Sequence, residues 1–413
     1  MEGIPVSEYR DRVRKVQEMA RRKKFDAILA YSDRRYSMGQ GVESGQNIRY
    51  LVGFSFPPHQ IQELDVVVPY MIGDSVLAIT PEDEPTLILT RRETERAKKQ
   101  TWIRDIKTTA DKFIDARYEG IAHFVGEILS KKRKWRIGIG GTHVPMQLYL
   151  ELARAFPRTN FVECTDELDL LRTIKSPKER EIMRKAAEIA DEGVSALIQA
   201  SRPGVTEYEM HIAAEKAMFD AGGDNPWSVI CTGPRSEISY MSPDYTQRKL
   251  REGDMVYADI GTELMGYHSD IQPAYTVGRG SRDQLQLIQT SLDMLKRMFE
   301  TTRPGVTDTD VLRAAYKVLE GSPFRNYVRT WTFGHGYGVG SDPPDMTGAT
   351  LTLPKSKQMK LQENMILCFE PGVFVPGLGG AALEDEVIVT SEGCEIISRC
   401  AERAEEFLKQ QSQ

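Results

Sequence analysis

The sequence predicts an α/β protein of two domains: an N-terminal α/β domain over residues 1–170, and a C-terminal domain over residues 171–413 built from duplicated α+β halves. Three observations support this fold class. A chain of 413 residues exceeds the usual size of one domain. Helical and strand-like segments alternate in the first part of the chain. A helix-start motif occurs twice in the second part.

The first domain is predicted from its hydrophobic periods. Apolar residues in the segment 7–24 have helical spacing, and the strand-like run FDAILAYS follows. The runs NIRYLVGF, LDVVVPYM, DSVLAIT and TLILT are also strand-like, and two more helices flank the strand WRIGIGG. These elements make an α/β domain of about 165 residues, which is a typical domain size.

The second domain opens at a capping box, in which Ser176 begins a long helix and Glu179 follows three residues later. The motif RPGVT then occurs twice, so that Thr206 and Thr307 stand 101 positions apart and each can cap a helix. This repeat predicts two related halves with a site between them. A helix-start motif that recurs without duplication is the alternative.

Two pairs of carboxylates stand on predicted hairpins of the second domain. A turn around Leu264 and Met265 would place Asp259 and Asp270 directly opposite each other, in the run DIGTELMGYHSD. Like charges that face each other across a strand pair are destabilising, so this pair indicates a cation between them. Glu370 and Glu384 form the second pair, and they would face each other in the same way around the Pro-Gly-rich turn of the run MILCFEPGVFVPGLGGAALEDEVIVT.

Four converging carboxylates predict a site for two divalent cations about 3.5–4 Å apart. A nitrogen ligand usually accompanies such oxygen ligands, and His335 in WTFGHGYGVGSDPPD is the candidate. A lone histidine is more often structural, but this one stands between the two carboxylate hairpins. His268 and His211 are instead expected to be packing residues.

The strings DIG, YHSD, GHGYGVG, FEPGVF and LEDEVIVT carry the five candidate ligands in order: Asp259, Asp270, His335, Glu370 and Glu384. This set resembles the ligand signature of the creatinase/aminopeptidase P/methionine aminopeptidase superfamily, which has the pita-bread fold. The run NIRYLVGF and the linker LLRTIKSPKEREIMRKAAE resemble its prolidase and creatinase branch. The resemblance covers nearly the whole chain.

The resemblance implies a hydrolase that cleaves a small amide or dipeptide C–N bond, of the Xaa-Pro dipeptidase or aminopeptidase type. In that family two divalent ions activate a water that attacks the amide carbonyl. Glu370 would be the general base as well as a metal ligand. The ions would be Mn²⁺, Co²⁺, Zn²⁺ or Fe²⁺. The family also implies a homodimer and a short peptide or other small molecule as substrate.

The chain departs from the family where peptidases hold their substrate. The histidine that usually precedes the first aspartate is absent, and Tyr240 lies in that region. Asp342 replaces the histidine that usually stands seven residues after the ligand histidine. Ala382 replaces the arginine that stands two residues before the last glutamate in proline-specific members, and Gln272-Pro273-Ala274 replaces the Thr-Arg-Thr run after the second aspartate. Tyr240 and Asp342 are therefore candidate catalytic residues, and a solvated turn position is the alternative for Asp342.

These departures keep other functions open. A specialised C–N hydrolase, of the creatinase or ectoine hydrolase kind, or a lyase like the dimethylsulfoniopropionate lyases would share the fold and change the chemistry. Creatinase itself has lost the metal ligands, whereas this chain keeps all five. A non-catalytic binding module of the same fold is less favoured for the same reason.

Composition excludes several classes of partner. The net charge is −6 and no wide basic face is evident, so nucleic acid is not an expected partner. No apolar run approaches the ~18 residues that cross a bilayer, so no membrane association is expected. The five cysteines are scattered without a CxxC pair, which argues against a disulfide framework or a zinc ribbon. We therefore expect a cytoplasmic enzyme.

Overall fold

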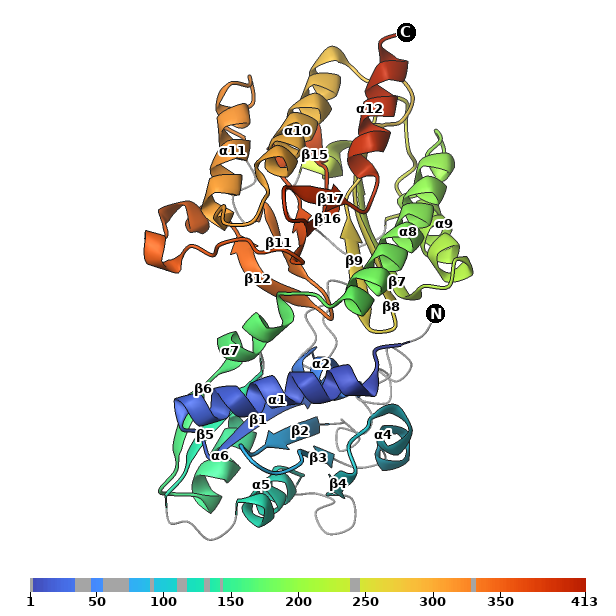
Figure 1. The fold of residues 1–413 in the computed structure, drawn as a ribbon. Helices are drawn as coiled ribbons and strands as arrows, with labels where there is room; N and C mark the ends of the chain where they lie inside the picture. The colour runs from blue at the N-terminus through green and yellow to red at the C-terminus, as the bar shows by residue number, and fades with distance from the viewer. Residues whose placement is uncertain are drawn as a thin grey trace. The chain divides into compact units, whose positions relative to one another are not determined.

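The computed structural model divides the chain into two compact units, Met1–Arg172 and Thr173–Gln413. Figure 1 draws both as ribbons. The structure describes residues 3–33, 46–54, 74–89, 93–109, 117–129, 134–141, 144–237, 246–327 and 332–413. The predicted fold class is confirmed, because each unit combines helices with β-sheet. Among the described residues, no helix has both the length and the apolar character needed to span a bilayer.

The first unit is built on a six-stranded mixed sheet in the order β4-β3-β2-β1-β5-β6. In its hydrophobic core, strand residues such as Leu29 pack with Ile121 and Leu152, which lie on two different helices. The strands are β1 (Ala27–Asp33), β2 (Asp74–Ile79), β3 (Thr86–Leu89), β4 (Asp105–Thr108), β5 (Arg136–Gly140) and β6 (Asn160–Glu163). The helices are α1 (Val6–Lys23), α2 (Gln46–Val52), α4 (Thr94–Gln100), α5 (Arg117–Ile128), α6 (Met146–Ala155) and α7 (Thr165–Asp169).

One predicted strand of this unit is wrong: most of the run NIRYLVGF lies in helix α2. Every residue of α2 is buried, and a short apolar run has no period that separates a buried strand from a buried helix. Arg12 of α1 fixes this helix, because its Nη1 donates to the Tyr50 carbonyl at 2.8 Å and its guanidinium lies 4.1 Å from the Tyr50 ring. The run LDVVVPYM lies outside the described residues.

The second unit has two main sheets. In one, β8 pairs with β7, β9 and β10; the other has the order β12-β11-β13-β16-β17. The strands are β7 (Asp224–Thr232), β8 (Met255–Leu264), β9 (Tyr267–Ile271), β10 (Ala274–Thr276), β11 (Gly334–Tyr337), β12 (Ser341–Met346), β13 (Ile366–Phe369), β14 (Gly372–Val375), β15 (Gly379–Ala382), β16 (Asp385–Val389) and β17 (Cys394–Ile396). The helices are α8 (Pro177–Ala200), α9 (Glu207–Asp220), α10 (Arg282–Thr301), α11 (Asp308–Glu320) and α12 (Cys400–Gln411).

The two halves of this unit repeat the same local structure. In each, a long helix is followed by a shorter one, α8 by α9 and α10 by α11, and each shorter helix begins at a complete capping box on Thr206 or Thr307. Each cap residue also forms an isolated bridge to a later segment, Thr206 to Lys249 and Thr307 to Lys360. The repeated RPGVT motif therefore marks equivalent positions in the two halves. The capping box predicted at Ser176 is present too.

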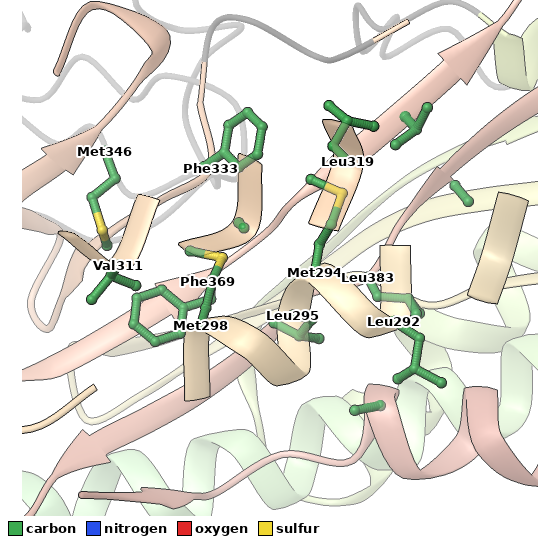
Figure 2. Packing of buried hydrophobic residues seen from close by; sticks show 14 of the residues in the cluster. Leu292, Met294, Leu295, Met298, Val311, Leu319, Phe333, Met346, Phe369 and Leu383 are labelled. Atoms are coloured by element: carbon green, nitrogen blue, oxygen red, sulfur yellow. The ribbon is translucent and has the colours of Figure 1, made fainter. Parts of the chain in front are cut away.

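Each half has its own hydrophobic core beneath its helices. In the first, Met210 of α9 packs with Ile260 of β8. In the second, residues of α10 and α11 pack against the sheet that contains β13, and Figure 2 shows Leu295, Met298 and Phe369 among them. The two cores hold the sheets in place from the helical side, so the polar side chains of the strands project to the other side.

Candidate metal centre

The first carboxylate pair stands on the hairpin of β8 and β9. Its predicted register is wrong: Leu264 pairs with Tyr267, so Asp270 is opposite Gly261 rather than Asp259. The cause is a two-residue turn at Met265 and Gly266, which both have positive φ (53° and 86°) as a tight hairpin turn requires. Because Asp259 lies two residues from Gly261, it shares a face with Asp270 and is its diagonal neighbour.

The second pair lies where a long hairpin passes from one sheet to another. Phe369 pairs with Asp385 and Gly372 pairs with Ala382, in the same register, so Glu370 and the residue before Asp385, Glu384, stand opposite each other. At this point the backbone amides of the two glutamates bond to other segments of the chain rather than to each other. The Glu384 amide donates to the Gln272 carbonyl at 2.9 Å, and the Glu370 amide donates to the Phe333 carbonyl at 2.9 Å. The change of partners brings these two glutamates next to the β9 end of the other sheet.

His335 points its Nε2 atom at the carboxylates. It lies on β11, with Nδ1 3.1 Å from the Gly336 carbonyl oxygen, which can only accept, so Nδ1 carries the proton. Nε2 is then left with its lone pair and lies 3.6 Å from Asp270 Oδ2 and 3.9 Å from Glu370 Oε1. This is the tautomer that a metal-binding histidine needs.

The donor atoms form two overlapping clusters. In one, a carboxylate oxygen from each of Asp259, Asp270 and Glu384 lies within 4.8 Å of the others. In the other, the donor atoms of His335, Cys368 and Glu384 lie equally close together. Glu384 belongs to both clusters, so a metal ion held by either cluster would have this glutamate among its ligands.

The burial and mutual repulsion of the carboxylates favour a bound cation. The carboxylates are almost wholly buried, with exposures of 2 % for Asp259, 5 % for Asp270, 3 % for Glu370 and 0 % for Glu384. Burial, and then the negative charge of Asp259, raise the pKa of Asp270 well above its ordinary value. A divalent ion bound among these carboxylates would offset both effects. The type and position of these donors fit divalent metal ions.

Two neighbours hold Glu370 in a fixed orientation. Thr332 Oγ1 donates to its Oε1 at 2.8 Å, and Gln272 Nε2 donates to its Oε2 at 3.0 Å. Gln272 is the first residue of the run that replaces the family's Thr-Arg-Thr, and this contact explains what it does here.

Asp342 is not a solvated turn residue. It lies in β12, is 2 % exposed, and its Oδ2 accepts from Lys175 Nζ at 2.8 Å in an ion pair whose side chains are each 1 % exposed. Asp342 belongs to neither donor cluster. Tyr240, the other candidate beyond the metal ligands, lies outside the described residues.

Among the described residues, neither His211 nor His268, which the sequence predicts to be packing residues, belongs to a donor cluster. His211 Nδ1 lies 2.8 Å from Ser228 Oγ and 3.0 Å from a Glu215 oxygen, on helix α9 and away from the donor clusters. His268 is 1 % exposed and its ring centroid lies 5.9 Å from that of Tyr337.

Sequence reasoning missed Cys368 and Lys175. Cys368 stands two residues before Glu370 and so projects to the same face of the chain as that glutamate, a signal that the strand period offers. Lys175 and Asp342 are 167 residues apart, and nothing in the sequence pattern pairs them.

Comparison with known proteins supports the same fold and family. Residues 181–391 match the model of metallopeptidase family M24, and residues 12–174 match that of the creatinase/prolidase N-terminal domain. The chain is 28 % identical over 344 residues to an Xaa-Pro dipeptidase of Pyrococcus furiosus. The aligned region covers 81 % of this chain and 91 % of that protein.

Two solved structures share the fold over almost their whole length. The prolidase of Pyrococcus horikoshii OT3 matches with a TM-score of 0.76 and 24 % identity, covering 94 % of this chain and 98 % of that one. The dipeptidase PepE of Mycobacterium ulcerans matches with a TM-score of 0.77 and 23 % identity, covering 96 % and 97 %.

Proposed function

Because the chain belongs to metallopeptidase family M24 and is a metallohydrolase, we propose that it binds two divalent metal ions and cleaves the amide bond of a dipeptide or other short peptide. The observation that carries this proposal is the pair of donor clusters that share Glu384. A relative named Xaa-Pro dipeptidase supports a substrate with proline in the second position.

Five residues would hold the ions in this proposal: Asp259, Asp270, His335, Glu370 and Glu384. When bound, the ions supply an activated water at neutral pH and polarise the substrate carbonyl. Mn²⁺, Co²⁺, Zn²⁺ and Fe²⁺ all suit this mixture of carboxylate and imidazole ligands.

Glu370 would move the proton in this reaction. Its carboxylate accepts a proton from the attacking water as the C–O bond forms, and delivers that proton to the amide nitrogen as the C–N bond breaks. The hydrogen bonds from Thr332 and Gln272 support this role, because they keep the carboxylate in one orientation throughout the reaction.

Asp342 and Tyr240 stay candidates for the substrate side of the site. Lys175 neutralises Asp342, so in this proposal Asp342 acts through the ion pair that ties β12 to the segment just before α8. This pair also favours the second candidate function, a specialised C–N hydrolase or a lyase. The imidazole that the family's peptidases have at this position is absent, and a Lys–Asp pair whose side chains are each 1 % exposed offers little surface to a substrate in its place.

We also propose that the protein is a cytoplasmic homodimer. All five cysteines are free, and four of them are buried, which suits a reducing compartment.

The test is hydrolysis of a panel of dipeptides, rich in Xaa-Pro, by protein loaded with Mn²⁺ or Co²⁺. Glu370→Gln is expected to abolish cleavage. Glu363→Gln, which changes an exposed glutamate just before β13, the strand that Glu370 follows, is expected to leave cleavage unchanged. Cleavage of Xaa-Pro dipeptides that depends on Glu370 supports the proposal. No cleavage by protein that contains two metal ions would favour the second candidate function.

A further inference from the structure

Cys368 faces the metal centre rather than the hydrophobic core. Its strand neighbours Leu367 and Phe369 belong to the core cluster of the second half, whereas Cys368 does not. Cys368 is directly opposite His335 on β11 and directly opposite Glu386 on β16. Residues directly opposite each other on antiparallel strands share a face, so these three side chains form one row across the sheet.

This row brings a sulfur atom to one side of the metal centre. Cys368 Sγ lies within 4.8 Å of donor atoms of both His335 and Glu384. Ligands on one ion at bond lengths of about 2.0–2.3 Å are separated by up to about 4.6 Å, so these three atoms need to move by no more than a few tenths of an ångström to share a cation. Cys368 is 0 % exposed, as the wall of a dry metal site requires.

The two clusters differ in the chemistry of their donors. Asp259, Asp270 and Glu384 offer only oxygen, which suits hard ions such as Mn²⁺ and Mg²⁺. His335, Cys368 and Glu384 offer nitrogen, sulfur and oxygen, which suits Zn²⁺, Co²⁺ and Fe²⁺.

We propose that the centre has two unlike positions: an oxygen-only position at Asp259, Asp270 and Glu384, and a thiophilic position that binds Zn²⁺, Co²⁺ or Fe²⁺ and at which the Cys368 thiolate joins His335, Glu370 and Glu384. The inference rests on the proposed dinuclear function and specifies which ion each side takes. Binding converts the thiol to the thiolate, and its proton leaves to solvent.

A purely structural role for Cys368 is the competing explanation. Its Sγ lies 4.0 Å from Glu386 Oε1, at the outer limit of a hydrogen bond involving sulfur. Glu386 has a closer donor in Ser269 Oγ, at 3.0 Å from its other oxygen. The long contact to Glu386 therefore does not account for the placement of sulfur beside His335 and Glu384.

The test is titration of the metal-free full-length protein with Co²⁺, followed by near-ultraviolet absorbance and by metal analysis. We expect a sulfur-to-cobalt charge-transfer band that saturates at one equivalent while total binding reaches two. Cys368→Ser is expected to lose this band. The matched control Cys231→Ser is expected to keep it, because Cys231 is a buried cysteine of the same unit that packs with Tyr257 and Phe374.

Metal preference provides a second readout. Cys368→Ser is expected to weaken the binding of the first Zn²⁺ by on the order of 10-fold or more, and to change Mn²⁺ binding far less. X-ray absorption by wild-type protein with one Zn²⁺ is expected to show one sulfur at about 2.3 Å, a result that does not depend on whether the variant folds.

The outcomes separate this inference from the proposed function. Two bound Co²⁺ ions without a sulfur band, or a band of equal size in Cys368→Ser, would overturn the thiophilic position and leave the dinuclear proposal standing. Failure of the wild-type protein to bind Co²⁺ at all would overturn both.

Discussion

Replacing Asp270 by asparagine should stabilise the metal-free protein. In the absence of a cation, burial and the charge of Asp259 raise the pKa of Asp270 well above 3.8, its ordinary value. When the pKa of an aspartate is higher in the folded state than in the unfolded state, the free energy of unfolding is greatest at a pH below the unfolded pKa. It then falls as the pH rises from the unfolded pKa towards the folded pKa. Asp270→Asn removes this loss, because asparagine does not titrate.

The magnitude follows from the burial of this carboxyl group. Leaving one buried polar group without a compensating partner costs about 1–3 kcal/mol, and more for a charged group. We therefore expect the metal-free Asp270→Asn variant to be more stable than wild type by about 1–3 kcal/mol at pH 7, because burial and the charge of Asp259 both act against the ionised carboxyl group. Near pH 4 the difference should be close to zero.

The assay is urea unfolding at several pH values, with chelator and with added Mn²⁺. Wild type should gain stability from Mn²⁺, and Asp270→Asn should gain much less because it has lost a ligand. A metal-free variant that is less stable than wild type at pH 7, or one that Mn²⁺ stabilises as strongly as wild type, would refute the reasoning.

Three further predictions concern residues outside the donor clusters. Lys175→Met should cost about 3–5 kcal/mol of unfolding free energy by leaving the Asp342 carboxylate buried without its lysine, and adding Asp342→Leu should recover most of that loss in a double-mutant cycle. Burial raises the pKa of Asp191 to about 7 against the opposing effect of Arg403, so stability should fall between about pH 4 and pH 7. Asp191→Asn should flatten that fall by up to about 4 kcal/mol, measured on the metal-loaded protein. Thr307→Ala should cost about 1 kcal/mol in urea unfolding by removing the side-chain cap of α11, and no cost at all would contradict the capping assignment.

The sequence predicted those elements whose signals are local. The capping boxes at Ser176, Thr206 and Thr307 have both partners within four residues, and all three are present. The order of five ligand-type residues was also readable, because each stands in a short distinctive string. The fold class followed from these features together.

Features that depend on the exact turn or on distant contacts were not readable in the same way. The hairpin register at Asp259 was missed because the turn lies one residue later than the symmetric arrangement, at Met265 and Gly266. The helix α2 was missed because a short apolar run fits either a strand or a helix.

The Lys175–Asp342 ion pair and the position of Cys368 depend on which strands become neighbours. Asp342 and Lys175 come from distant segments, and Cys368 meets His335 only because β13 pairs with β11. Non-local pairing of this kind leaves no periodic signal in the chain. The substrate-side differences noted in the sequence therefore became interpretable only once these contacts were known.

The most direct test of the dinuclear centre is an anomalous difference map from crystals of the full-length protein soaked in Co²⁺. We expect two peaks about 3.5–4 Å apart, among Asp259, Asp270, His335, Glu370 and Glu384. A map with fewer than two peaks at these residues, from crystals in which bound Co²⁺ is found elsewhere, would contradict the dinuclear proposal.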